Sequence, residues 1–276
     1  MCCALVALSL LGACDSPAAT NDIKVISYNI RYSGAPDVDG DNYWTFRKEA
    51  SLKMIDQEQP TVMGMQEVCP DQLAYLVQNL TNYKHIGVGR EDGVAEGECM
   101  AIFYDTRKVT LGANGTFWLS ETPDSVSQGW DGACKRTCTW GVFKMIGTGK
   151  EFVYFNTHLD HRGKIAREES IKLLVSKIAE LAPQGLPVFL TADFNSSTSE
   201  PIFDPLKAVL KDARATSPVT DNGGTYTGFG ESEGVHVIDH IFYKGATPKA
   251  FRVLRGDYGA PYISDHYPIV FTGELE

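Results

Sequence analysis

The chain has 276 residues, of which 43% are hydrophobic and 22% are charged, and both values are ordinary for a globular protein. Its formal net charge is −10 at pH 7. This acidic balance disfavours an extended nucleic-acid-binding surface, which needs a basic stripe, but it is compatible with local phosphate binding through a metal and a few arginines.

The first 13 residues predict a signal segment. Residues 4–13 form an apolar run of the length of a signal-peptide core, too short to cross a bilayer as a helix. The run ends Leu-Gly-Ala-Cys and resembles a bacterial lipoprotein signal, in which the cysteine carries a lipid; an ordinary cleaved signal with a chance cysteine is the alternative. Residues 14–22 predict a flexible tether. We therefore expect an exported protein, either periplasmic or anchored to a bacterial membrane through a lipid on Cys14.

Residues 23–276 are expected to form one large domain, because no linker divides them. The predicted strands lie near residues 23–29, 61–67, 83–89, 100–104, 108–119, 139–146, 151–158, 187–192, 236–243, 249–255 and 267–272. The predicted helices lie at 46–59, 72–80, 164–181 and 201–210. Many strands with few helices favour two packed sheets with outer helices over a doubly wound parallel sheet. The long loops at 33–44, 90–98, 121–137 and 217–235 are candidates for substrate contacts.

Six of the strand-like segments end on an acid, an amide or an imidazole. The polar residues at these endings are Asn29, Gln66 and Glu67, Asn156 and His158, Asp193 and Asn195, Asp239, and Asp265 and His266. Six such endings suggest a single site collected from many strand ends. Carboxylate and amide oxygens with only two imidazoles favour Mg²⁺ chemistry on phosphate over a zinc site.

Four cysteines follow the signal segment and tether: Cys69, Cys99, Cys134 and Cys138. Four cysteines allow three pairings, and an exported protein meets an oxidising compartment, so we favour the disulfides Cys69–Cys99 and Cys134–Cys138. Free buried thiols are the alternative. A metal site on Cys134 and Cys138 is disfavoured, because no further His or Cys accompanies them.

The motifs resemble those of the endonuclease/exonuclease/phosphatase superfamily, which includes deoxyribonucleases, inositol polyphosphate phosphatases, sphingomyelinases and the nocturnin and deadenylase branch. They are Ser27–Ile30, Gln66–Glu67, Asn156–Leu159, Asp193–Asn195, Ile238–Ile241 and Ser264–His266. The resemblance covers Ile23 to Thr272. Segments outside these motifs are similar to those of bacterial exported members near the nocturnin branch. It implies an α+β fold, a four-layer α/β/β/α sandwich of two mainly antiparallel sheets packed face to face with outer helices.

The resemblance also implies a Mg²⁺-dependent phosphoesterase, with Mn²⁺ as the alternative metal. Glu67 would be the principal metal ligand, assisted by Asn29 and Asp265. Asp193 would accept a proton from the attacking water, or at least orient it, and Asn195 would donate a hydrogen bond to the phosphoryl group.

Two histidines would contact the phosphate. His266 would lie opposite the metal, with Asp239 holding its other ring nitrogen, and His158 would be a second donor. Glu98 precedes a hydrophobic strand, as does the acid that orients the equivalent histidine in deoxyribonuclease-like members. We therefore expect a hydrogen bond between Glu98 and His158, with a solvated loop acid as the alternative.

Three loop residues are candidates for substrate binding. Arg136 could clamp a phosphate through two hydrogen bonds, or it could form a surface salt bridge. Tyr226 and Phe229 could stack on a base, a sugar or a lipid head group, or they could pack within their loop. His161 and His240 are expected to be structural.

We therefore expect an enzyme that cleaves a phosphomonoester or phosphodiester by in-line attack of water, on a small phosphorylated substrate or a lipid head group. It is expected to be a monomer without an obligate protein partner. One alternative is a secreted nuclease, which the acidic charge disfavours. Another is a catalytically silent surface-binding lipoprotein, which the presence of Glu67, Asp193 and His266 disfavours.

Overall fold

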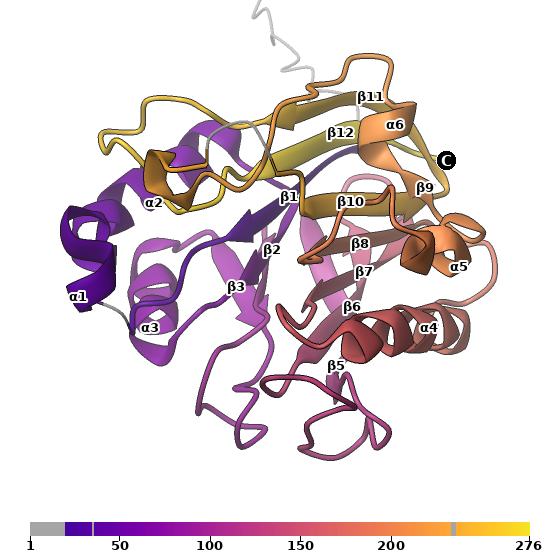
Figure 1. The fold of residues 1–276 in the computed structure, drawn as a ribbon. Helices are drawn as coiled ribbons and strands as arrows, with labels where there is room; N and C mark the ends of the chain where they lie inside the picture. The colour runs from indigo at the N-terminus through magenta and orange to yellow at the C-terminus, as the bar shows by residue number, and fades with distance from the viewer. Residues whose placement is uncertain (1–19, 35, 233–235) are drawn as a thin grey trace, which may run out of the picture.

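The structure, a computed structural model, describes residues 20–34, 36–232 and 236–276 (Figure 1). The predicted signal segment and Cys14 lie outside these residues, as does most of the predicted tether. Asp22, the last tether residue, already belongs to the first strand. Within the described ranges, no helix is both long enough and apolar enough to cross a membrane.

The described residues form two six-stranded sheets (Figure 1). The first has the order β11-β12-β1-β2-β4-β3 and consists of β1 (Asp22–Asn29), β2 (Val62–Gln66), β3 (Tyr83–Ile86), β4 (Ile102–Asp105), β11 (Ala246–Val253) and β12 (Ile269–Leu275). The second has the order β5-β6-β7-β8-β10-β9 and consists of β5 (Val109–Trp118), β6 (Thr137–Met145), β7 (Glu151–His158), β8 (Val188–Asp193), β9 (Lys211–Asp212) and β10 (Asp239–Lys244). The pairs β1–β2 and β7–β8 are parallel and the others are antiparallel, which confirms the predicted sheet type.

Helices α2 (Trp44–Glu58) and α3 (Pro70–Asn79) lie on the outer face of the first sheet, and α4 (Lys164–Leu181) and α5 (Asp204–Lys207) on that of the second (Figure 1). The short helix α6 (Ala213–Thr216) contacts β10 and β11 and adds Ala213 to the layer between the sheets. The remaining elements are α1 (Pro36–Asp39) and 3₁₀ turns at Gly40–Asn42, Pro201–Phe203 and Gly228–Gly230. Helix α2 ends where Gln59 adopts a left-handed conformation before Pro60. The predicted helix at 201–210 is only a 3₁₀ turn followed by α5. The shortest elements, α1, β9 and α6, are not predicted because two to four residues carry no periodicity.

Three apolar layers hold the sandwich together. The central layer lies between the sheets and includes Val25 from β1 and Phe189 from β8. A second layer packs the first sheet against α2 and α3, and a third packs the second sheet against α4 and α5. The predicted four-layer α/β/β/α architecture is therefore confirmed.

The inner faces of the sheets change from apolar to polar along the strands. Successive side chains of a strand point to opposite faces, so Phe189, Thr191 and Asp193 of β8 share the inner face. Asn156 and His158 of β7 follow the same alternation. The register of the parallel pair places His158 beside Asp193. The polar strand ends therefore gather at one edge of the space between the sheets.

A buried hydrogen-bond network joins the sheets beneath that edge. Gln66 Nε2 donates to Asn156 Oδ1 (2.7 Å), and Thr191 Oγ1 donates to the same oxygen (3.1 Å). The Tyr154 hydroxyl lies 2.7 Å from Thr191 Oγ1. Gly64 leaves the space for this network, because a Cβ there would lie 2.4 Å from both Asn156 Oδ1 and Thr191 Oγ1.

Gly64→Ala should lower the free energy of unfolding by about 1–3 kcal/mol, because overpacking this buried polar network forces side chains or backbone to shift. Gly112→Ala in β5 is the matched control, since its added Cβ would meet nothing nearer than 3.5 Å. We expect that control to stay within about 0.5 kcal/mol of the parent protein. Urea unfolding followed by circular dichroism compares the two variants, and equal stability would contradict the prediction.

The favoured disulfide pairing is wrong, because all four cysteines of the described chain are free thiols. Cys138 lies in the apolar layer beneath α4, whereas Cys134 Sγ lies 3.7 Å from Asp160 Oδ2 in a loop. Cys99 packs in the layer beneath α2 and α3, and Cys69 stands at the N-cap of α3. An oxidising compartment permits disulfides but does not bring side chains on different elements into bonding geometry.

The buried thiols should be inert in the folded protein. Burial raises the pKa of Cys99 to about 12 and also raises that of Cys138, so neither forms the reactive thiolate readily. We expect iodoacetamide to label the partly exposed Cys69 and Cys134 first, and the other two only after unfolding. Peptide mapping by mass spectrometry measures this order, and recovery of disulfide-linked peptide pairs from the purified protein would contradict it.

Candidate active site

The polar strand ends line one cavity of about 680 Å³. Of the residues predicted from the sequence, the cavity lining includes Glu67, Glu98, Arg136, His158, Asp193, Asn195, Tyr226, Asp265 and His266. Asn29 and Asp239 are buried and hydrogen-bonded to members of this group. The predicted site therefore comes together at one place, although individual contacts differ from the predictions.

Asp193 lies at the centre of the site. Its Oδ2 accepts a hydrogen bond from Asn29 Nδ2 (2.9 Å) and lies 3.3 Å from His158 Nε2 and 3.7 Å from His266 Nε2. Burial raises the pKa of Asp193 to about 7; His266 opposes this rise and the Asp239 carboxylate adds to it. A carboxyl group that titrates near neutral pH is suited to accept a proton from water.

The two histidines of the site hold opposite protonation states. His266 Nδ1 donates to Asp239 Oδ2 (2.8 Å). Burial opposes a charge on His266, but the Asp239 and Asp193 carboxylates raise its pKa well above its usual value. Burial, together with the Arg136 charge, lowers the pKa of His158 well below its usual value. At neutral pH, His266 is therefore an imidazolium that can donate through Nε2, whereas His158 is neutral.

Two site residues follow strand ends in a left-handed backbone conformation. Glu67 has a φ of 65° and Asn195 a φ of 50°, and non-glycine residues adopt such angles only at an energetic cost. The Asn195 side chain is fixed from two sides, because Nδ2 donates to the Leu159 carbonyl (3.0 Å) and to His158 Nε2 (2.9 Å). This backbone geometry places both side chains in the cavity directly beyond their strands.

The acidic side of the cavity is formed by Glu67 and Asp265. Glu67 Oε2 accepts the Tyr32 N–H (3.0 Å), and Oε1 accepts from Asn29 Nδ2 (3.0 Å). Asp265 Oδ2 lies 3.6 Å from Arg31 Nη1. Burial and the neighbouring Glu67 raise the pKa of Asp265, so these two carboxylates repel each other. Two crowded, hard oxygen donors fit a divalent cation.

Asn29 is oriented differently from what its predicted role as a ligand requires. Its Oδ1 accepts the Arg31 N–H (3.0 Å), so its amide nitrogen faces the carboxylates of Glu67 and Asp193. Around Asp193, two groups of side chains place ligand atoms within 4.8 Å of one another, namely Glu67, His158 and Asp193, and Asp193, Asp239 and His266. In this arrangement Asn29 orients two carboxylates instead of offering an oxygen.

The predicted hydrogen bond between Glu98 and His158 is wrong. Glu98 Oε2 instead accepts from Arg90 Nη1 (2.6 Å), and His158 Nδ1 is buried without a hydrogen-bond partner. Burial and the Glu67 carboxylate raise the pKa of Glu98, whereas Arg90 opposes that rise. Arg90 competes for the carboxylate as a charged donor, and no sequence pattern signals its position.

Arg136 is buried, with 6% of its surface exposed, which disfavours the alternative of a surface salt bridge. Its Nη2 lies 3.2 Å from His161 Nδ1, and its Nε lies 3.8 Å from Asp160 Oδ2. His161, expected to be structural, lines the cavity. Cys134, Asp160 and His161 place potential ligand atoms within 4.8 Å of one another, but the Arg136 cation beside them argues against a metal there.

The two aromatic candidates occupy different places. Tyr226 lines the cavity and packs edge-on against His266, with 5.0 Å between ring centroids. Phe229 instead packs against Tyr262, with 6.4 Å between ring centroids, and lies below the Arg47 guanidinium (5.6 Å). Tyr226 is therefore available to a substrate, whereas Phe229 holds its loop.

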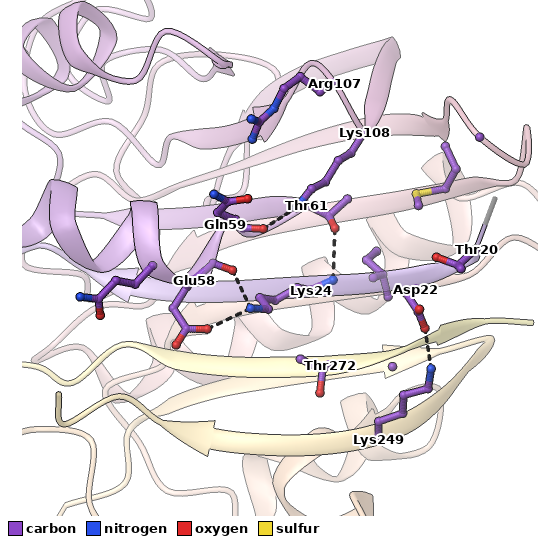
Figure 2. A pocket seen from close by; sticks show the side chains of 15 residues that line it. Thr20, Asp22, Lys24, Glu58, Gln59, Thr61, Arg107, Lys108, Lys249 and Thr272 are labelled. Carbon is purple, nitrogen blue, oxygen red and sulfur yellow. Dashed lines mark hydrogen bonds and ion pairs between the residues drawn. The ribbon is translucent and has the colours of Figure 1, made fainter. Parts of the chain in front are cut away.

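A second cavity, of about 860 Å³, lies around the beginning of β1, at the end opposite to Asn29 (Figure 2). Lys24 Nζ pairs with Glu58 Oε2 (3.1 Å), and Lys249 pairs with Asp22. Arg107 and Lys108, which also line this cavity, pair with the buried Asp105, so its charged groups are all engaged and we assign the cavity no part in the chemistry.

Residues 26–266 match the model of the Endonuclease/Exonuclease/phosphatase family. The chain belongs to this family. A family structure from Bacteroides vulgatus is 35% identical, with a TM-score of 0.87, and the match covers 92% of this chain and 99% of that one. The Bacteroides thetaiotaomicron mannosyl-6-phosphatase Bt3783 is 38% identical, with a TM-score of 0.85 and coverage of 90% and 98%. Drosophila melanogaster nocturnin is 24% identical, and the match spans 97% of this chain but 49% of nocturnin.

Membership of the endonuclease/exonuclease/phosphatase family confirms the predicted resemblance and the predicted enzyme class. Family members are metal-dependent hydrolases of phosphoric ester bonds, and this chain is such an enzyme. The buried acids and histidines of the cavity agree with that chemistry. The alternative of a catalytically silent scaffold is thereby set aside.

Proposed function

We propose that the protein is a Mg²⁺-dependent phosphomonoesterase that acts on a small sugar phosphate. The observation that carries this proposal is the arrangement around Asp193, whose buried carboxylate lies 3.7 Å from His266 Nε2 and 3.3 Å from His158 Nε2 in one cavity. The 38% identity to a mannosyl-6-phosphatase over nearly the whole of that chain supports a phosphomonoester of a sugar.

In this proposal, each residue of the site has a separate role in phosphoryl transfer. Asp193 accepts a proton from a water that attacks phosphorus in line. His266 donates a hydrogen bond through Nε2 to a phosphoryl oxygen, while Asp239 fixes its other nitrogen. Asn195, which follows the same end of β8 as Asp193, supplies a second donor when its Nδ2 exchanges the bond to His158 Nε2 (2.9 Å) for one to a phosphoryl oxygen. Donors placed before the reaction stabilise charge as it develops, which is the larger part of such catalysis.

Glu67 and Asp265 are the residues that would hold Mg²⁺, with Asn29 orienting the Glu67 carboxylate through its 3.0 Å hydrogen bond. When bound, a divalent cation polarises a phosphoryl oxygen and neutralises negative charge on the leaving group. Hard oxygen ligands favour Mg²⁺ over zinc, and Mn²⁺ is the alternative that accepts the same ligands.

The proposed lipid anchor on Cys14 bears on the substrate. Thr20 lines the cavity at the beginning of β1, and the eight residues of β1 then lead to Asn29 at the active site. At about 3.3 Å per residue, the strand spans roughly 25 Å. The active site therefore lies at the end of β1 far from the proposed anchor, which is compatible with a soluble phosphate ester as substrate.

A panel of phosphate esters tests the proposal. We expect hydrolysis of p-nitrophenyl phosphate and of hexose 6-phosphates with Mg²⁺, loss of activity with a chelator, and recovery when Mg²⁺ is restored. His266→Ala serves as the catalytic control and should be inactive. Activity that survives both chelation and this substitution would overturn the mechanism. Hydrolysis of DNA or RNA far faster than of the small esters would instead favour the nuclease alternative.

A further inference from the structure

The cavity has a second polar wall that the phosphoryl chemistry does not use. It consists of Arg90 and Glu98, from the loop before β4, and Arg136 and His161, from the segments before β6 and after β7. Glu98 accepts from Arg90 (2.6 Å), and Arg136 Nη2 lies 3.2 Å from His161 Nδ1. We refer to these four residues as the rim.

The loops that carry the rim are tied to one another. Asp160 Oδ2 accepts the Ala133 N–H (2.9 Å), which joins the segment after β7 to the loop before β6. Lys135 Nζ pairs with Glu91 Oε2 (2.6 Å), and Trp118 Nε1 donates to the Arg90 carbonyl (2.9 Å). The rim is therefore built in advance, as a recognition site must be if it is to bind a small polar group without ordering loops.

The rim has donors that no protein group satisfies. Arg136 is more than nine-tenths buried, yet its Nε and Nη1 form no hydrogen bond. Buried polar groups in native proteins are normally paired, so a guanidinium on a cavity wall with two nitrogens that lack a hydrogen bond indicates a ligand. Arg136 and Glu98 line the same cavity, and the Arg136 charge opposes the rise in the pKa of Glu98.

The charges of the rim distinguish between possible ligands. Arg90 and Arg136 carry two positive charges, while Glu98 and Asp160 carry two negative charges against them, at 2.6 Å and 3.8 Å respectively. Asp160 lies behind the rim, outside the cavity lining, and with its charge counted the positive charges are matched, so this wall has no excess charge to attract a second phosphate. A wall in which donors stand beside an acceptor does match hydroxyl groups, which both donate and accept hydrogen bonds.

We propose that Glu98 and Arg136 are specificity-determining residues that bind the hydroxyl groups of a sugar whose phosphate lies at Asp193 and His266. This inference rests on the proposed phosphomonoesterase function. Glu98 accepts a hydrogen bond from one hydroxyl group, and Arg136 donates one to a neighbouring hydroxyl. These two contacts select the substrate. A site built to bind a hydroxyl discriminates strongly against an ester that lacks it, because its buried groups are then left unpaired.

The test compares kcat/KM for hexose 6-phosphates (glucose, mannose and galactose) with kcat/KM for p-nitrophenyl phosphate, whose leaving group has no sugar hydroxyls. In the parent protein we expect a preference for at least one hexose phosphate. Glu98→Gln and Arg136→Met should each lower the ratio of the two kcat/KM values by about 10- to 100-fold, the range for a lost hydrogen bond to a charged group. Glu96→Gln is the matched control, an exposed acid of the same loop that lies outside the cavity lining, and it should preserve the ratio.

The outcomes separate this inference from the function on which it rests. If neither p-nitrophenyl phosphate nor any hexose phosphate is hydrolysed with Mg²⁺, the phosphomonoesterase proposal itself fails. If p-nitrophenyl phosphate is hydrolysed but no hexose phosphate is preferred, only the sugar site fails. Equal losses on both substrates in the Arg136→Met variant would show that Arg136 binds the phosphate, as a clamp would, and would likewise overturn the inference.

Discussion

Asp193→Asn should lower kcat by about 10²- to 10⁴-fold, the usual contribution of a positioned general base. Asparagine has nearly the same shape and can still accept the Asn195 N–H that Asp193 Oδ1 accepts (2.9 Å). It cannot take a proton from water. Initial rates on p-nitrophenyl phosphate with saturating Mg²⁺ measure the loss, with Asp124→Asn, the same change at an exposed surface acid, as the control.

The same substitution should not lower the thermal stability of the protein. Burial raises the pKa of Asp193 to about 7, so at pH 8 the ionised carboxylate is less favourable in the folded than in the unfolded chain. Replacing it by a neutral amide removes that cost. A variant with reduced kcat and an unchanged or raised melting temperature would support a catalytic role. Retention of more than a tenth of the parent kcat would contradict the assignment of Asp193 as the base.

The sequence was sufficient to predict the centre of the site because the side-chain period of a strand is two. Thr191 and Asp193 must face the same side as Phe189, which is buried between the sheets. Once the apolar residues define the inner face, the polar residue at the strand end lies at the edge of that same layer. The same reasoning holds for His158 on β7 and Asp239 on β10, and the structure brings all of them together.

The rim could not be predicted in this way, because its residues lie on loops and loops have no side-chain period. Glu98 was expected to contact His158, but its carboxylate instead accepts a hydrogen bond from Arg90, eight positions earlier in the sequence. Arg136 meets His161 where Asp160 ties two loops together through backbone N–H groups. The predicted cysteine pairing was wrong for a related reason. The redox compartment and the number of cysteines limit which disulfides are possible, but they do not determine where the side chains lie.

Glu67→Gln should lower the affinity for the metal, and turnover should fall as a consequence. The variant keeps an oxygen for the Asn29 hydrogen bond (3.0 Å) but loses the negative charge on the acidic side of the cavity. We expect Mn²⁺ affinity, measured by isothermal titration, to fall by at least about 10- to 100-fold, since even outer contacts of a metal site contribute that much. Activity should fall in parallel and recover partly at high Mg²⁺ concentration.

Comparison of this variant with Asp193→Asn separates the two sides of the cavity. Asp193→Asn should lose turnover while retaining most of its metal affinity, whereas Glu67→Gln should lose metal affinity. Glu180→Gln, a change at an exposed acid of α4, should alter neither quantity. If Glu67→Gln binds Mn²⁺ as tightly as the parent protein, the cation is held instead by the group formed by Asp193, Asp239 and His266, whose ligand atoms also lie within 4.8 Å of one another. His266 would then be a ligand and could not act as the imidazolium donor, so one titration decides between two mechanisms for the same cavity.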